Sequence, residues 1–349
     1  MKKVTVLTVV LFLLAFSGCG YESKQPVVAT GSPTATGTPS KTDVVAGTAP
    51  EKVQPPWSRK KDMPTARYSH RSAVLDDKIY VLGGSNGSNL DVVEVYDTKT
   101  DTWTGAADIP MTTECIGAVG TGGRIYAFMK GKTYDEKGWV FEYDPALDKW
   151  EQKCRMTSAR SNLGITVLDE KIYVIGGLEN TDAEGHFENV KDVETLDPKT
   201  MVWEKKADLT EAKHAVSVSA LNGKIYAVGG SITSGTSDYP CKDVEEYDPA
   251  TDSWTKKANL PNQNAYNCSA ILNGQIYVTG GVTGRRLFSY DPVQDKWTAG
   301  EFRDIASWHN TASAAGGKLY VIGGTDTMGD GSWTALNAVE VYDPQLDTE

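Results

Sequence analysis

The chain has little histidine, little cysteine and a deficit of positive charge, and each shortage narrows its chemistry. Only four histidines and five cysteines occur in 349 residues. None of them has the HxxH, CxxC or HExxH spacing, so we expect no transition-metal site and no cofactor. The formal net charge is -11 at pH 7. Nucleic acid is therefore disfavoured as a partner, since its phosphates carry the same sign of charge.

Long apolar runs are also missing, apart from one near the N-terminus. Lys2 and Lys3 precede an apolar stretch from Val4 to Phe16, which is shorter than the ~20 residues that cross a bilayer. Residues 1–18 are therefore predicted to be a signal peptide. The following Cys19 completes a sequence that resembles a bacterial lipobox, although Phe16 departs from the usual leucine. The resemblance implies a lipidated Cys19 and a protein anchored to the outer face of the cytoplasmic membrane, or to an outer membrane if the host has one.

Residues 19–56 contain the lipidated cysteine and a stretch rich in Thr, Pro, Gly, Ser, Ala and Val. This stretch has neither the helical nor the strand period, so it is predicted to be a disordered tether. We expect it to hold a folded domain, residues 57–349, away from the membrane. A monomer is expected.

The folded domain is built from one repeated unit. In every copy a tryptophan stands 23 residues before a tyrosine that lies in an apolar, β-branched run, which indicates a conserved path of strand, turn and strand. A second tyrosine, or Leu196, stands seven residues before the next tryptophan. All variation in length falls between the two strand tyrosines, and loops that vary in this way commonly carry function. The tryptophans are Trp57, Trp103, Trp150, Trp203, Trp254 and Trp297.

The repeat resembles the kelch motif, in which a Gly-Gly pair ends a strand and Tyr and Trp follow at fixed spacing. Five copies keep the glycine pair, beginning with Gly83-Gly84. The resemblance implies an all-β fold, a six-bladed kelch β-propeller with four antiparallel strands per blade. Trp57 opens an outer strand that has no earlier strands of its own blade. We therefore predict that this N-terminal strand completes the last blade and closes the ring, which would remove exposed sheet edges.

Ligand-binding residues are expected where each blade begins, on the same rim as the variable loops. Basic and aromatic side chains there could stack on a sugar and pair with a carboxylate. The alternative, which we weight above ligand binding for Arg67, Arg160 and Lys213, is a set of hydrogen bonds between blades. The residues at these corners are Arg67, Tyr68, Arg160, Asn162, Lys213, His214, Asn264, Tyr266, Trp308 and His309.

Blade six departs most from the repeat. Arg303 replaces an apolar residue of the other blades, and Trp308, His309 and Trp333 fall outside the repeated pattern. An exposed aromatic patch beside Arg67 and Tyr68 is the favoured ligand site. Two cysteines, Cys241 and Cys268, are predicted to lie on this rim and could form a disulfide in an oxidising compartment.

Two classes of function remain open. The favoured one is a membrane-anchored, extracytoplasmic module that binds a protein or a carbohydrate through its variable-loop rim. The alternative is an enzyme, because six-bladed kelch propellers resemble the secreted bacterial proteins that interconvert sialic acid anomers. No catalytic residues are assigned, since no residue set here matches that family's active site. A galactose-oxidase type of copper enzyme is disfavoured by the scattered histidines. Fold alone does not decide between these classes.

Overall fold

The computed structural model describes residues 55–133, 135–182, 186–234, 237–327 and 333–347. The predicted signal peptide, the lipidation site Cys19 and nearly all of the predicted tether lie outside these ranges. Within them, no helix has the length and apolar character needed to cross a membrane.

Six four-stranded antiparallel sheets make up the described domain. Each begins with an inner strand and continues outward in chain order, as in β2-β3-β4-β5, except that the outermost strand of the last sheet is β1. The first four sheets contain β2 (Arg71–Leu75), β3 (Lys78–Leu82), β4 (Val93–Asp97) and β5 (Thr102–Ala106); β6 (Cys115–Thr121), β7 (Arg124–Met129), β8 (Trp139–Asp144) and β9 (Lys149–Arg155); β11 (Gly164–Leu168), β12 (Lys171–Ile175), β15 (Val193–Asp197) and β16 (Val202–Lys206); and β17 (Ser217–Leu221), β18 (Lys224–Val228), β21 (Val244–Asp248) and β22 (Ser253–Lys257). The last two contain β23 (Asn267–Leu272), β24 (Gln275–Gly280), β25 (Arg286–Asp291) and β26 (Lys296–Phe302); and β27 (Thr311–Ala315), β28 (Lys318–Thr327), β29 (Trp333–Tyr342) and β1 (Trp57–Arg59).

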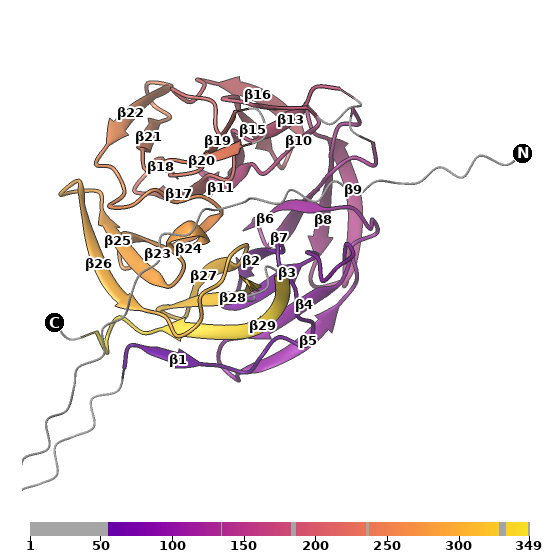
Figure 1. Cartoon of the computed structure of the whole chain (residues 1–349). Helices are drawn as coiled ribbons and strands as arrows, with labels where there is room; N and C mark the ends of the chain where they lie inside the picture. The colour runs from indigo at the N-terminus through magenta and orange to yellow at the C-terminus, as the bar shows by residue number, and fades with distance from the viewer. Residues whose placement is uncertain (1–54, 134, 183–185, 235–236, 328–332, 348–349) are drawn as a thin grey trace, which may run out of the picture. The chain divides into compact units, whose positions relative to one another are not determined.

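The sheets follow one another around a centre that is lined by their inner strands (Figure 1). Each inner strand contacts the next, and β27 contacts β2. Apolar side chains between adjacent sheets form six buried clusters, one of which joins the last sheet to the first through Tyr320 and Tyr96. This arrangement confirms the predicted propeller fold. The sheets must pack on one another, because an isolated four-stranded sheet could not bury both of its faces.

The last sheet combines strands from distant parts of the sequence. Trp57 of β1 pairs with Tyr342 of β29, and their rings pack with centroids 5.2 Å apart. Trp57 is buried, 6% exposed. This is the pairing that the unpartnered tryptophan predicted, and it covers what would otherwise be the free edge of β29.

A repeated clasp explains why the spacing between the tyrosines and tryptophans is constant. The Tyr96 hydroxyl donates to Asp101 at 2.8 Å, and Asp101 also accepts from the backbone N–H of Lys61 at 2.9 Å. The Trp103 indole donates to the Lys61 carbonyl at 2.9 Å. These bonds join the turn between β4 and β5 to the segment that follows β1, the outer strand of the neighbouring sheet. Insertion of a residue would break these bonds. Equivalent aspartates are Asp148, Asp252 and Asp295.

The variable loops build extra structure on one rim. The third sheet carries a small sheet of β10 (Arg160–Ser161), β13 (Leu178–Asn180) and β14 (Phe187–Asn189), and the fourth carries the hairpin of β19 (Ser231–Ser234) and β20 (Ser237–Pro240). In the sixth sheet β28 and β29 continue beyond the four-strand core. The fifth sheet has only a short 3-10 turn, η1 (Gly281–Thr283). The connection between the second and third strands, counted from the second-strand tyrosine to the third-strand tyrosine or Leu196, is therefore shortest in the fifth sheet.

Candidate binding rim and channel mouth

Three of the basic residues predicted to bind ligand are instead buried in ion pairs. Arg67 pairs with Glu94 and Arg160 with Glu194, while the Lys213 ammonium lies 2.9 Å from Glu245. Each cation contacts a carboxylate of the sheet that it leads into, and not of the neighbouring sheet as the alternative interpretation expected. Burial lowers the pKa of Arg67, although the Glu94 carboxylate opposes this effect. These buried side chains hold the corners of three blades in place.

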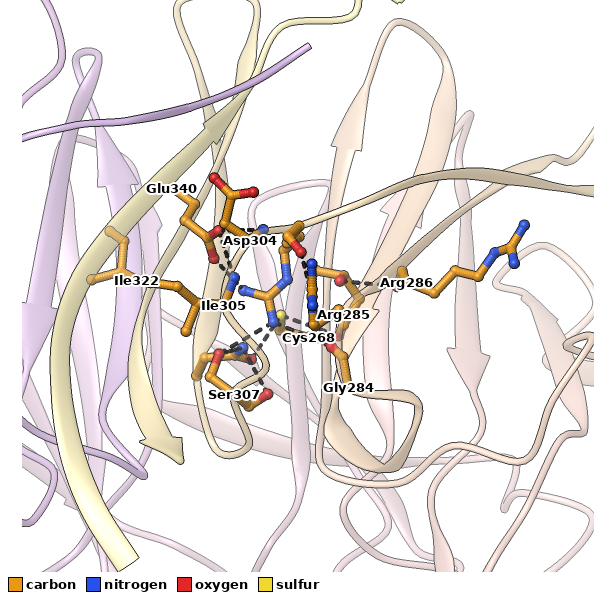
Figure 2. A network of polar contacts seen from close by, with 12 residues as sticks. Cys268, Gly284, Arg285, Arg286, Asp304, Ile305, Ser307, Ile322 and Glu340 are labelled. Atoms are coloured by element: carbon orange, nitrogen blue, oxygen red, sulfur yellow. Dashed lines mark hydrogen bonds and ion pairs between the residues drawn. The ribbon is translucent and has the colours of Figure 1, made fainter. Parts of the chain in front are cut away.

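The same arrangement explains the aberrant Arg303. Its guanidinium donates to Glu340 at 3.0 Å and to the hydroxyl of Ser307 at 3.2 Å. Ser307 stands where the other sheets have Arg67, Arg160 or Lys213, so the cation has moved four residues along the chain but still reaches the repeated glutamate. Figure 2 shows Glu340, Ile305 and Ser307 gathered in this network. In the second and fifth sheets the glutamate is replaced by Phe141 and Phe288, and the cation by Thr113 and Asn264.

Aromatic rings form an arc around the mouth of the central channel. Tyr68 packs against Trp333, Trp333 against His309 and His309 against Tyr266, with centroids 6.3, 5.7 and 4.7 Å apart. The next contact, from Tyr266 to His214, is 5.9 Å. The sequence predicted Tyr68, His214, His309 and Trp333 as binding residues of this rim, and Tyr266 occupies a corner position like the first three. Trp308 lies beside them, partly buried, and its backbone pairs with Thr325.

One end of the arc is a polar cluster. Tyr266 donates its hydroxyl to Asp238 at 2.9 Å, and the Nε2 atom of His214 lies 3.3 Å from the same hydroxyl and 3.6 Å from Asp238. Hydrogen bonding to His214 is the main cause that lowers the pKa of Asp238 to about 2. Burial raises the pKa of Tyr266. The Nδ1 atom of His214 faces Asn189 at 3.0 Å, so loops of two sheets meet here.

The channel mouth contains a cavity of about 190 Å³ lined by residues from all six sheets. Tyr266 and His309 form part of its wall, and so does Arg71, which the sequence analysis missed. A signal was available: Arg71 stands 14 residues after Trp57, where the other repeats have Gly117, Gly164, Ser217, Cys268 and Thr311. A large cation in a position otherwise occupied by small residues marks a side chain that projects into the channel.

The predicted disulfide between Cys241 and Cys268 is wrong, since both thiols are free. Cys268 lies on the channel-lining strand β23 and donates to Asn310 at 3.1 Å, whereas Cys241 follows the hairpin β19–β20 and contacts the Tyr239 carbonyl. The two residues share a rim but have separate partners. Burial raises the pKa of the Cys268 thiol to about 12. Within the described ranges, no group of three His, Cys, Asp or Glu side chains could hold a metal ion.

The strand order, the glycine pairs and the repeated clasp together define a kelch β-propeller. A family model described as the Attractin/LZTR1 beta-propeller matches residues 37–285, and a Kelch motif model matches residues 309–348. The chain therefore belongs to the Attractin/LZTR1 β-propeller family.

Its relatives include much longer proteins. Alpha-scruin of Limulus polyphemus is 32% identical over 183 residues, which cover 50% of this chain and 20% of alpha-scruin. Kelch-like protein 36 of Mus musculus is 29% identical over 211 residues, which cover 59% of this chain and 34% of that protein. The chain thus spans a fifth to a third of these relatives. A solved structure titled "Structure of YjhT" has a TM-score of 0.66 at 18% identity, covering 82% of this chain and 100% of the other, which shows a shared fold.

Proposed function

We propose that this propeller is a binding module that holds a protein partner on its loop-bearing rim, outside the cytoplasmic membrane. The observation that carries the proposal is the segregation of exposed side chains. Tyr239, Phe302 and Trp333 are 58%, 54% and 50% exposed, and all three lie on the rim of the variable loops. Large exposed aromatics are typical of the residues that dominate binding energy at protein interfaces.

The other exposed large hydrophobic residues among those described are aliphatic and lie in or beside turns of the opposite rim. They are Leu147, Val202, Val293 and Leu346. Scattered aliphatic residues of this kind are normal on protein surfaces. The aromatic group therefore favours one rim over the other as the interface.

Two arginines beside Phe302, Arg285 and Arg286, strengthen this assignment. Within the described ranges they and Arg71 are the only arginines that make no ion pair. The Arg286 guanidinium stands 4.8 Å from the centre of the Phe302 ring, and Arg286 extends away from the polar network in Figure 2. Arginine and aromatic residues are the types enriched at interface centres. Acidic groups on the partner are expected opposite them.

The proposal is tested by affinity capture from a cell-envelope extract. Wild-type protein is compared with a Tyr239→Ser/Phe302→Ser/Trp333→Ser variant and with a control on the opposite rim, Leu147→Ser/Val202→Ser/Val293→Ser. A partner that is retained by wild type and control but reduced at least tenfold by the rim variant is expected. Equal retention by both variants would contradict the proposal. Enrichment of glycan alone would assign the rim to carbohydrate.

The proposed location depends on Cys19. A Cys19→Ser variant should lose incorporation of labelled palmitate and should be released from the membrane fraction. If the variant remains membrane-bound and the wild type takes up no label, Cys19 is not the anchor and the protein is attached in another way.

A second candidate function is suggested by the cluster of His214, Asp238 and Tyr266. A tyrosine hydroxyl between an imidazole and a carboxylate, at the wall of a cavity, could exchange a proton with a sugar hydroxyl. The resemblance in architecture to the secreted kelch proteins that interconvert sialic acid anomers gives a substrate for the test. Anomer exchange is followed by NMR with wild type and Tyr266→Phe. Acceleration by wild type that the variant lacks would favour an enzyme, and absence of acceleration would leave the binding module.

A further inference from the structure

The channel-mouth cavity has an unusual charge. Its wall is made entirely of described residues, and Arg71 is the only Asp, Glu, Lys or Arg among them. Burial and the nearby Arg71 lower the pKa of His309 to about 4, so this second basic residue is neutral at pH 7. The cavity thus holds one positive charge and no negative charge, although the whole chain has a net charge of -11.

The Arg71 guanidinium is held in a fixed orientation by backbone carbonyls. Its Nε atom donates to the Ile116 carbonyl of the neighbouring sheet at 3.0 Å, and Nη1 donates to the carbonyls of His70 and Ser69 at 3.1 and 3.4 Å. The Nη2 atom has no hydrogen-bond acceptor within the described ranges, and no carboxylate neutralises the charge. A guanidinium that is already positioned loses little side-chain entropy when it binds a carboxylate.

A second polar group in the wall lacks partners. Both the amide nitrogen and the amide oxygen of Asn267 are buried and make no hydrogen bond in the described structure. An unpaired buried amide is destabilising, but both of its polar atoms are covered by protein and are not open to a ligand in the cavity. The ring nitrogens of His309 likewise have no partner in the described residues. Tyr266 and His309 add flat apolar surface to the same wall.

We infer that the channel mouth binds a small hydroxycarboxylic acid, with its carboxylate on Arg71 and a hydroxyl group on His309. The size of the cavity supports a small ligand, since 190 Å³ is below the ~300–1,000 Å³ of sites for drug-sized molecules. This site is separate from the proposed protein interface, because Tyr239, Phe302, Arg285 and Arg286 do not line the cavity. Either function can therefore fail without the other.

The inference is tested by isothermal titration calorimetry with three free acids, L-lactate, L-tartrate and D-gluconate. D-glucose serves as the uncharged match for gluconate. The α-amide of N-acetyl-glutamate, whose side-chain carboxylate is free, represents an acidic side chain of a protein. At least one hydroxy acid should bind below 10 mM, and glucose should not. An Arg71→Met variant should bind that acid at least tenfold more weakly, which corresponds to about 1.4 kcal/mol.

Two further variants make the result specific. Arg124→Met removes an arginine on the opposite rim, outside both the cavity and the proposed interface, and should leave binding unchanged within twofold. Asn267→Asp keeps the shape of the side chain but adds a negative charge to the wall, so it should also weaken binding at least tenfold. Circular dichroism and thermal melting establish that the variants are folded.

Several outcomes would overturn the inference. They are the failure of all three acids to bind, equal binding of the acid by wild type and a folded Arg71→Met, and equal binding of glucose and gluconate. Binding of the glutamate derivative alone would assign the charge to a protein ligand and would also overturn it. Loss of protein capture in the rim variant has no bearing on this measurement.

Discussion

The buried ion pairs show that two positions of the repeat, a glutamate and a cation, change together. Four sheets keep a glutamate on the third strand from the channel and a cation that reaches it, and two sheets replace both partners. A buried charge left without its partner is costly, about 3–5 kcal/mol, whereas loss of both charges can be neutral. The repeats have therefore changed in pairs, and Arg303 with Ser307 is one such paired change.

Moving the cation back should restore the arrangement of the other sheets. Arg303→Met alone leaves Glu340 buried without a charge partner and is expected to lower the free energy of unfolding by about 3–5 kcal/mol. The double variant Arg303→Met/Ser307→Arg has Met and Arg at the positions occupied by Met63 and Arg67 in the first sheet, and it should recover most of that loss. Urea unfolding measures both. A double variant no more stable than Arg303→Met would show that the two positions are not interchangeable.

The buried histidine His70 predicts a dependence of stability on pH. Burial, followed by the charges of Arg67 and Arg71, lowers its pKa from 6.5 to about 3. The unfolded chain therefore binds a proton more readily than the folded one between these values. The free energy of unfolding should fall as the pH drops from 6.5 towards 3, by at most about 1.4 kcal/mol per pH unit from this residue.

The histidine contribution is isolated by a His70→Asn variant. The variant is expected to be less stable at pH 7, because the His70 bond to the Ile322 carbonyl is altered, but the difference from wild type should narrow as the pH falls. Urea unfolding at pH 7, 6, 5 and 4 gives the difference directly. A constant difference over this range would mean that His70 titrates alike in the folded and unfolded chains.

Residue types at the corners were predictable, but their orientation was not. The sequence showed that Arg67, Arg160 and Lys213 recur at one position, and recurrence favours a structural role. The inward orientation of Arg71, four residues further on, was missed, since it depends on which side chains of the inner strand point towards the channel. Comparison of the repeats at that position would have found it, because size is restricted there in every other copy.

At the level of strands, the repeat spacing predicted the sheets because the clasp of Tyr, Asp and Trp tolerates no insertion. The extra strands on the rim were not predictable, since β13, β14, β19 and β20 lie in loops whose lengths differ between copies and follow no repeat. The glycine pairs carry a similar constraint. A Cβ on Gly84, where φ is +94°, would lie 2.8 Å from the Tyr68 carbonyl oxygen, so another residue there would displace the loop.

The first strand, β1, should contribute to stability mainly through Trp57. Trp57 is more buried than the other repeated tryptophans and packs on Tyr342, so Trp57→Ala should lower the free energy of unfolding by about 3–5 kcal/mol. Trp103→Ala is the matched control and should cost less, because Trp103 is partly exposed. Denaturant titration compares the two. Equal or smaller loss at Trp57 would indicate that β1 contributes little to the last sheet.

For the whole molecule, the shared last sheet predicts where the chain can be cut. A permuted chain that links Asp347 to Trp57 and opens between Lys99 and Thr100 would again complete one sheet from two ends of the chain, this time with β5. Its stability should approach that of the wild type. A cut at Pro110, between two sheets, leaves no sheet completed by both ends and should give the less stable protein. The reverse order in urea unfolding would contradict the role assigned to β1.

The pairing of β1 with β29 also affects the order of events in time. Among the described strands β1 leaves the ribosome first and β29 last, so the sixth sheet cannot form until all the other strands have been made. Pairing between distant segments is slow, because the entropy of closing a long loop is lost before the contact is gained. If the chain is exported as predicted, the open sheet edge of β29 would be covered only after translocation, and this final step would set how long the new protein is exposed to aggregation and proteolysis.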